Sequence, residues 1–139
     1  MTEKTTQSVA NLGYHAHIYY DPERTRDVAA ALREQIGERF LVQIGRWHDN
    51  PVGPHSRAMY QVAFTVGLFA RFVPWLMLNR NGLDILIHPN TDRPRDDHLV
   101  HAMWMGEVLE VYGHVVPERH EPEHERTPIV PNTRPTLAA

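Results

Sequence analysis

A strict alternation near the N-terminus predicts the first strand of this chain. Residues 13–20 read GYHAHIYY, so His15, His17 and Tyr19 point to one side, and the residues between them, which are largely apolar, point to the other. A period of two is typical of a strand that packs one face against a core. The face that carries the two histidines is therefore expected to be polar and aromatic.

Downstream, the pattern changes between helical and strand periodicity several times. It predicts, in chain order, a helix over 22–37, a strand over 40–47, a strand over 58–64, a helix over 66–82, a strand over 83–89 and a last helix over 94–111. Together with the first strand, this is the β-α-β-β-α-β order of a ferredoxin-like α+β sandwich with an appended C-terminal helix. The two central helices are expected on one face of the sheet, which leaves the other face open.

Local signals set the expected bounds of the helices. Asp21 and Pro22 are an N-cap and a first-turn proline for the first helix, and Gly37 is expected to end it. Pro74 is expected to kink or split the second helix. In the last helix, three side chains are expected on one side: His98, His101 and Met105.

The open face of such a sheet would collect polar side chains from every strand. The parity of the later strands adds Gln43, Gln61 and His88 to the polar side of the first strand. The first and last strands are neighbours in this fold, so His88 is expected to approach His15 or His17 across the ladder. A face of this kind is poor core material and a suitable floor for a pocket, completed by a homodimer partner or by the C-terminal helix.

The two ends of the chain lack this patterning. Residues 1–12 are polar, and residues 117–139 carry several prolines and mixed charges. We therefore predict a single catalytic domain over 13–116 between two tails. His120 and His124 fall in the second tail and are discounted as site residues.

Composition removes several classes of function. The 139 residues carry a formal net charge of −3 and no basic stripe, so neither nucleic acid nor a membrane surface is an expected partner. The absence of cysteine excludes disulfides, zinc–thiolate sites, iron–sulfur clusters and a cysteine nucleophile. With no signal peptide and no apolar run of membrane-spanning length, the expected location is the cytoplasm.

The ten histidines stand out in this ordinary composition, because histidine is the commonest metal ligand. His15 and His17 are spaced to reach one ion from one strand face, and the stiff loop 48–55 begins and ends with histidine. Each histidine alone is more often structural or solvated. Imidazoles from separate elements that meet on one face, however, indicate a metal site. Such ligands suit Fe(II), Zn(II), Cu or Ni, and no carboxylate is spaced as an obvious further ligand.

Four segments together resemble a known family. They read GYHAHIYYDP, RWHDNPVGPH, VPWLMLNRNGLDILIHPNT and DDH followed by WMG, and they span about residues 13–106 in this order. The chain thereby resembles the DOPA 4,5-dioxygenase family. The resemblance implies a ferredoxin-like fold that often forms a dimer. It also implies a non-haem Fe(II) centre that cleaves the ring of a catechol such as L-DOPA with O2 in an extradiol reaction.

The motifs of the family fall on His15, His17, His55, His88 and His98, which are therefore candidate site residues, but the resemblance does not divide them into ligands and other roles. The expected ligands of Fe(II), which Zn or Ni could replace in a purified sample, are His17, His55 and His88. The expected catalytic residues outside the ligand set are His15, His48 and His98, of which His48 or His98 is the expected base. The residues expected to orient the substrate are Tyr19, Arg46 and Gln61, since an arginine suits a substrate carboxylate.

A non-catalytic module is the alternative from a different class. A dimeric ferredoxin-like domain could hold a structural or regulatory metal, or an apolar ligand, on its histidine-lined face without turnover. A cofactor-independent enzyme that uses the same face is a third possibility. Metal content separates the first two, because a structural zinc fills four protein ligands and a catalytic iron keeps open positions.

Overall fold

The computed structural model describes residues 8–9, 13–119 and 128–139, so His120 and His124 lie outside the described residues. The elements are, in chain order, β1 (Gly13–Tyr19), α1 (Arg26–Arg39), β2 (Gln43–Ile44), β3 (Met59–Thr65), α2 (Phe69–Asn79), β4 (Ile85–Pro89), α3 (Pro94–Leu99) and β5 (Met103–Met105), with short 3-10 turns at Val66–Leu68 and Gly113–Val115. None of the helices in the described part of the chain is both long and apolar enough to cross a membrane.

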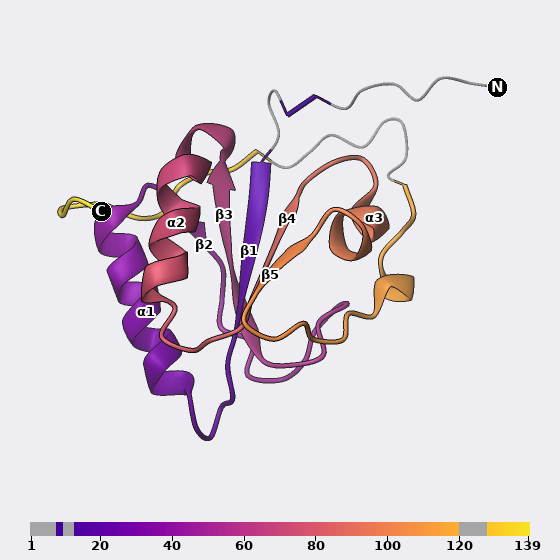
Figure 1. Cartoon of the computed structure of the whole chain (residues 1–139), viewed down its shortest axis with the longest axis horizontal. Helices are drawn as coiled ribbons and strands as arrows, with labels where there is room; N and C mark the ends of the chain where they lie inside the picture. Colours follow the sequence, from indigo (N-terminus) through magenta and orange to yellow (C-terminus); the bar gives the residue numbers. More distant parts are fainter. Residues whose placement is uncertain (1–7, 10–12, 120–127) are drawn as a thin grey trace.

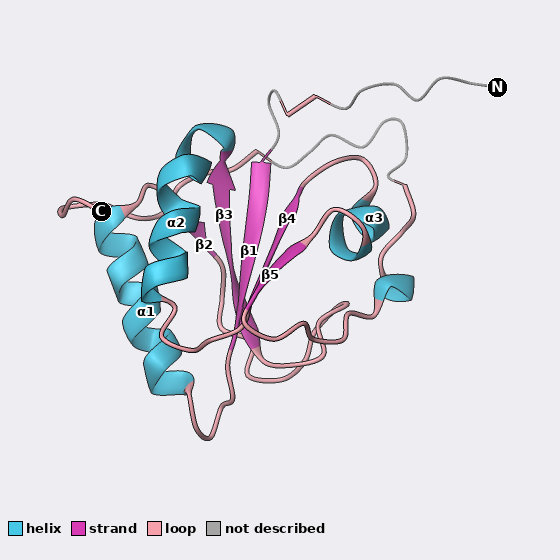
Figure 2. Cartoon of the chain, viewed as in Figure 1, coloured by secondary structure: helices cyan, strands magenta, loops and turns pink. Residues whose placement is uncertain are grey.

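The strands form one antiparallel sheet in the order β2-β3-β1-β4-β5 (Figure 1). The first four strands have the predicted ferredoxin-like arrangement, with β1 between β3 and β4. In the ladder, His15 of β1 lies opposite Ala63 of β3 and His88 of β4. The predicted α+β sandwich is therefore confirmed, and β5 extends it at one edge (Figure 2).

The main core lies between the sheet and the helices α1 and α2, which pack side by side on one face (Figure 1). From β1 and β4 it receives side chains at alternate positions: Ala16, Ile18, Ile85 and Ile87. The helices contribute Ala29, Leu32, Ile36, Phe72, Val73 and Leu76. Each large apolar side chain that leaves water here contributes roughly 1.5–3 kcal/mol. The predicted division of β1 into an apolar and a polar face is confirmed.

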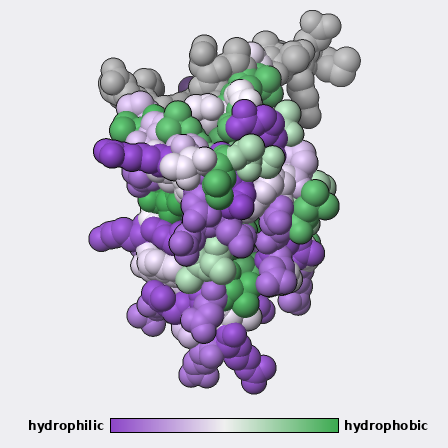
Figure 3. All heavy atoms as spheres, turned by 90° about the vertical axis from the view of Figure 1, so that its left-hand side faces the viewer, coloured by the Kyte–Doolittle hydropathy of each residue, from purple (hydrophilic) through white to green (hydrophobic). Residues whose placement is uncertain are grey.

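The outer surface of α1 and α2 is mainly hydrophilic, with separate apolar spots (Figure 3). Met77 and Leu78 of α2 are exposed apolar side chains. This layer separates the core from solvent and carries no cluster of histidines. The histidines of β1 point to the opposite face of the sheet.

The prediction of a long C-terminal helix is wrong. α3 ends at Leu99, and Met103–Met105 pair with β4 as β5, which places Met105 opposite Ile85 in the core. The backbone groups at the free edge of β4 need partners, and this pairing satisfies them. Gly106, with φ of 82°, then turns the chain in a conformation that favours glycine. For the same reason the predicted common helical side is wrong for His98, His101 and Met105.

The predicted start of the first helix is also wrong, because α1 begins at Arg26 rather than at Pro22. Asp21 caps a turn instead. Its side chain accepts a hydrogen bond from the backbone N–H of Glu23 at 2.9 Å, and its carbonyl oxygen accepts one from Thr25 N at 2.9 Å. The local turn uses the donors that would have begun the helix.

Three other bounds differ from the prediction. Gly37 lies inside α1, which continues to Arg39 because the helical hydrogen bonds extend to Phe40, whose N–H donates to the carbonyl oxygen of Ile36 at 2.9 Å. The strand expected over 40–47 is reduced to β2, since the buried side chain of Phe40 enters the core before pairing begins. α2 is continuous through Pro74, because packing of its buried face against the core outweighs the lost hydrogen bond.

The C-terminal segment, residues 128–139, lies along the outer edge of β2. Asn132 N donates to Val42 O at 3.0 Å, and the Asn132 side chain bonds both backbone groups of Ile44, at 2.8 and 2.9 Å. Thr133 Oγ1 accepts a hydrogen bond from Val42 N at 3.0 Å. The outward-facing backbone groups of this edge are thus satisfied within the chain.

Candidate metal centre

Five histidines from four parts of the chain meet on the face of the sheet opposite α1 and α2: His15 and His17 of β1, His88 of β4, His98 of α3 and His55 of the loop before β3. Ring centroids are 4.1 Å apart for His17 and His55, and also for His88 and His98. The exposed fractions of His17, His55 and His88 are 2%, 4% and 2%. The partly accessible members of this histidine cluster are His15 and His98.

The strand ladder brings three of these histidines together. His15 and His17 flank the buried Ala16, and His15 lies opposite His88 in the β1–β4 register. Nε2 of His17 is 3.0 Å from Nε2 of His88. On the other side of its ring, Nδ1 of His88 donates to the carbonyl oxygen of Pro89 at 2.8 Å. The predicted approach of these histidines across the ladder is confirmed.

Helix α3 holds His98 over the same face. Nδ1 of His98 donates to the carbonyl oxygen of Pro94 at 2.7 Å. The buried carboxylate of the preceding residue, Asp97, accepts hydrogen bonds from the N–H and the hydroxyl of Thr91, at 2.8 and 2.6 Å. Burial raises the pKa of Asp97, and the bonds from Thr91 oppose that shift. Asp97 therefore fastens α3 to the chain that follows β4 and so fixes the position of His98.

The loop before β3 supplies His55, whose backbone forms a bridge with Val111. Nδ1 of His55 lies 2.6 Å from the hydroxyl oxygen of Tyr19, a side chain that is 3% exposed. The Tyr19 ring stacks on Trp104, with centroids 5.7 Å apart and an interplanar angle of 24°. Burial raises the pKa of Tyr19, so its hydroxyl stays protonated. Tyr19, predicted to orient a substrate, is here a buried partner of His55.

Burial keeps four histidines of the cluster neutral: His15, His17, His55 and His88. It lowers the pKa of His15 and of His55 to about 4, and the charge of nearby His98 adds to both shifts. The pKa values of His17 and His88 are lowered well below the usual range, first by burial and then by neighbouring imidazoles. A neutral imidazole carries a lone pair, which is the form that binds a metal.

The donor set fits a metal ion. Two sets of three histidines offer ring nitrogens within 4.8 Å of one another: His15, His17 and His88, and His17, His55 and His98. His17 belongs to both sets, and its Nδ1 is buried without a hydrogen-bond partner in the described part of the chain. A bound cation would satisfy such a lone pair. The predicted ligand set of His17, His55 and His88 shares two members with each of these sets.

The other predicted site residues lie around this cluster at different places. Gln61 lies opposite His17 in the β1–β3 ladder and shares its face. His48 is bridged to the start of β3, and its charge contributes to the lowered pKa of His55. Arg46 is exposed and forms no hydrogen bond or ion pair with any described residue. The roles of these three residues toward a substrate stay predictions.

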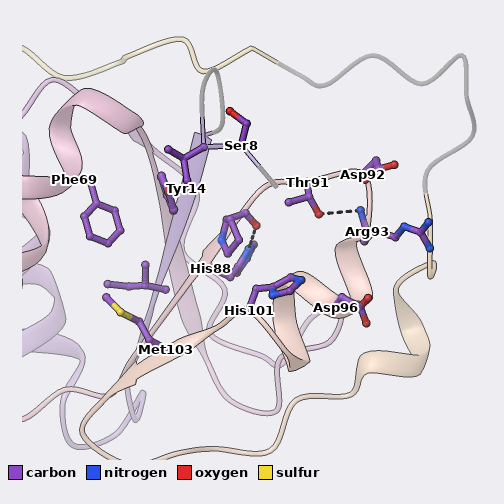
Figure 4. A pocket seen from close by; sticks show the side chains of 13 residues that line it. Ser8, Tyr14, Phe69, His88, Thr91, Asp92, Arg93, Asp96, His101 and Met103 are labelled. Carbon is purple, nitrogen blue, oxygen red and sulfur yellow. Dashed lines mark hydrogen bonds between the residues drawn. The ribbon is translucent and has the colours of Figure 1, made fainter. Parts of the chain in front are cut away.

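A groove of about 720 Å³ adjoins the cluster at His88. Figure 4 shows Tyr14, Phe69 and Met103 on one side of His88 and His101 on the other. The groove is therefore apolar at one end and polar at the other. Its volume lies in the range of sites that bind small molecules.

Comparisons with known proteins agree with this fold. The sequence profile of the Dopa 4,5-dioxygenase family matches residues 14–115. The chain belongs to this family. A DOPA 4,5-dioxygenase of Amanita muscaria is 31% identical over 101 residues, which cover 67% of this chain and 44% of that protein. An uncharacterized 21.2 kDa protein of Botryotinia fuckeliana is 39% identical over 108 residues, which cover 69% of this chain and 58% of that protein.

This member of the Dopa 4,5-dioxygenase family thus spans about half the length of the curated relatives it matches. A crystal structure from Nostoc punctiforme, of a candidate dioxygenase, is 50% identical and superposes with a TM-score of 0.76. That comparison covers 80% of this chain and 96% of the other. Family and neighbour thus agree on the fold that carries the histidine cluster.

Two parts of the site were not assigned by sequence reasoning. Trp104, which stacks on Tyr19, had no predicted role, although it lies in the WMG segment of the family resemblance. Thr91, in the segment HPNT, was not linked to Asp97. Both contacts join residues from different elements, so spacing along the chain gave no sign of them.

Proposed function

We propose that this member of the Dopa 4,5-dioxygenase family is a non-haem Fe(II) extradiol dioxygenase that cleaves the ring of a catechol such as L-DOPA with O2. The observation that carries the proposal is the cluster of five histidines, in which Nδ1 of His17 is buried with no hydrogen-bond partner among the described residues. Bound iron would supply open coordination positions for the catechol and O2. Family membership supports the reaction class.

The chain's own residues would hold the ion and handle the proton. The predicted ligands are His17, His55 and His88, and the two convergent sets each contain two of them. A histidine outside the ligand set would take the phenolic proton of the catechol, and the candidates are His15, His48 and His98. Burial of the central histidines excludes water from the ring nitrogens.

The substrate would be oriented from the periphery of the cluster. Gln61 lies on the same face as the histidines, and Arg46 could bind a substrate carboxylate from the exposed side. The groove beside His88 offers apolar contacts for the body of an aromatic molecule.

Anaerobic reconstitution with Fe(II), followed by O2 and a panel of L-DOPA and simple catechols, tests the proposal. We expect a ring-cleavage chromophore with at least one of them. His17→Ala, which removes the residue common to both sets, should abolish product, and His114→Ala at the exposed 3-10 turn should not. A protein that binds iron and yields no chromophore from any catechol would rule out the dioxygenase and favour a non-catalytic metal-binding module.

A cytoplasmic homodimer is also part of the proposal. All five histidines of the cluster come from one chain, so the metal site needs no residue from a partner. Light scattering coupled to size-exclusion chromatography of the purified chain tests the dimer, and a monomer at working concentrations would exclude it.

A further inference from the structure

The hydrogen bonds of the histidine cluster distinguish its two possible ligand sets, because they determine which ring nitrogen of each histidine carries a proton. A neutral imidazole has one N–H donor and one lone pair. Nδ1 of His88 lies 2.8 Å from the carbonyl oxygen of Pro89, which can only accept. The proton of His88 is therefore on Nδ1, and its Nε2 carries the lone pair.

His17 must then be the donor to His88. Their Nε2 atoms are 3.0 Å apart, and the lone pair on His88 leaves Nε2 of His17 to supply the hydrogen. The lone pair of His17 consequently lies on Nδ1, the buried nitrogen without a partner among the described residues. His17 thus has a lone pair to give, while that of His88 is already occupied by His17.

In the set of His17, His55 and His98, the other two histidines can also present a ring nitrogen to an ion. Nδ1 of His98 donates to the carbonyl oxygen of Pro94, so Nε2 of His98 carries a lone pair. Nδ1 of His55 lies 2.6 Å from the hydroxyl oxygen of Tyr19. When Nε2 of His55 binds an ion, its proton is on Nδ1, and this hydroxyl oxygen is the acceptor for it. Metal-binding histidines commonly donate their second N–H to a protein acceptor in this way.

The other set, which consists of His15, His17 and His88, is less suited to bind an ion with these hydrogen bonds in place. His15 has no hydrogen-bond partner for its ring among the described residues, and His88 would have to lose the bond from His17 before it could bind an ion. If His17 bound through Nε2, its proton would move to the buried Nδ1, for which the described part of the chain offers no acceptor.

We infer that the ion is held by Nδ1 of His17 and Nε2 of His55 and His98, and that His88 and Tyr19 are positioning residues that accept the second N–H of His17 and His55. The inference rests on the proposed function only in that a divalent ion binds; it does not depend on ring cleavage. It revises the expected ligand set by exchanging His88 for His98. It also leaves His15 beside the site without a bond to the ion.

Titration of the metal-free full-length chain with Co(II), followed by visible absorption and calorimetry, tests the assignment without any substrate. The matched variants are His98→Ala and His15→Ala, since both side chains are partly accessible. We expect His98→Ala to lose Co(II) binding and His15→Ala to keep an affinity close to that of the unmodified chain. Loss of binding in His15→Ala, with or without loss in His98→Ala, would overturn the inference, and so would an unmodified chain that binds no Co(II).

His88 is tested by a conservative replacement. Glutamine can still accept the N–H of His17, so His88→Gln should retain Co(II) binding, whereas His88→Ala should weaken it by about 10–100-fold. If His88→Gln abolished Co(II) binding while the far-UV circular-dichroism spectrum stayed unchanged, His88 would be a ligand and its positioning role would be refuted.

A measurement on the unmodified, metal-free chain removes any dependence on variants. Two-bond 1H–15N correlation spectra report the protonated nitrogen of each histidine. We expect Nε2–H for His17 and Nδ1–H for His88 and His98. A His17 protonated on Nδ1 would contradict the inference, whereas a chain that shows the expected tautomers and binds Co(II) but cleaves no catechol would refute only the proposed reaction.

Discussion

At the residue scale, the chemistry of the cluster depends on partners that are not themselves exposed to a substrate. Tyr19 is the clearest case, because its hydroxyl is buried and bonded to His55 while its ring packs on Trp104. A tyrosine on the polar face of a strand suggests contact with a ligand. In this structure the tyrosine is buried against Trp104, and its hydroxyl contacts His55, so it affects the ion only by holding His55 in place.

Tyr19→Phe should therefore weaken metal binding by about 10–100-fold, the usual effect of removing an acceptor behind a metal-binding histidine. The lost hydrogen bond should also lower the free energy of unfolding by about 1 kcal/mol. Tyr112→Phe is the matched control, since Tyr112 is exposed and its hydroxyl forms no hydrogen bond with any described residue. Calorimetric titration with Co(II) and urea unfolding check both effects, and equal behaviour of the two variants would contradict the role of Tyr19.

The neutral histidines also predict a pH dependence for the metal-free chain. The pKa of His15 and of His55 is about 4 in the folded state, against about 6.5 in the unfolded state. The unfolded chain therefore binds more protons between these values, and the free energy of unfolding should fall as the pH is lowered from about 6.5 to about 4. Urea unfolding across this range measures the slope. His15→Gln should make it shallower and His114→Gln should not; a pH-independent stability would be inconsistent with buried neutral histidines.

At the scale of elements, α3 has only six residues and yet positions His98. So short a helix is marginal on its own, and its place is set by tertiary bonds. The carboxylate of Asp97 bonds Thr91, and Arg95 donates to the carbonyl oxygens of Gly113 and Val116, at 3.1 and 3.2 Å from its Nε. These contacts, rather than helix propensity, determine where His98 points.

Asp97→Ala should destabilise the chain by about 1–3 kcal/mol, because it leaves two donors of Thr91 without an acceptor. It should also weaken Co(II) binding, since His98 loses its fixed position. Asp96→Ala is the control on the same helix, where the side chain is exposed. Thermal unfolding and metal titration of both variants check the prediction, which fails if Asp97→Ala behaves like Asp96→Ala.

At the scale of the whole molecule, the C-terminal segment closes one edge of the sheet. Unpaired strand edges can pair with another chain, and here Asn132 and Thr133 occupy the outward-facing groups of Val42 and Ile44. Prolines 128, 131 and 135 lack N–H donors, so the segment itself offers few groups to a further strand. The sheet therefore ends at this side within the chain.

Asn132→Ala should expose the backbone amide of Ile44, which now donates a hydrogen bond to the side-chain Oδ1 of Asn132 at 2.8 Å. Hydrogen exchange of that amide should become faster, while the amides of β1 should be unchanged because they lie at the centre of the sheet. Arg134→Ala is the control within the same segment, since Arg134 forms no hydrogen bond with the described residues. Unchanged exchange at Ile44 in Asn132→Ala would show that the segment does not protect this edge.

The sequence predicted well those features that follow from local periodicity. The alternation in β1 assigned Ala16 and Ile18 to the core and the histidines to the opposite face, and strand order then brought His88 toward them. The prediction of a long last helix was wrong because Met103–Met105 pair with the edge of β4 instead of continuing a helix. Asp97 and Thr91 could not be linked, since neither residue type nor spacing reveals a bond between a loop and the short helix that follows it.

By itself, the sequence determined which side chains lie on each face of the sheet, because a strand alternates strictly and burial of apolar residues fixes its orientation. It therefore determined that histidines would gather on one face. Only the tertiary structure decided which ring nitrogens converge, since this depends on the placement of α3 and the loop before β3 and on hydrogen bonds to Tyr19, Pro89 and Pro94. Those bonds join groups whose distance is set by packing and not by their separation along the chain.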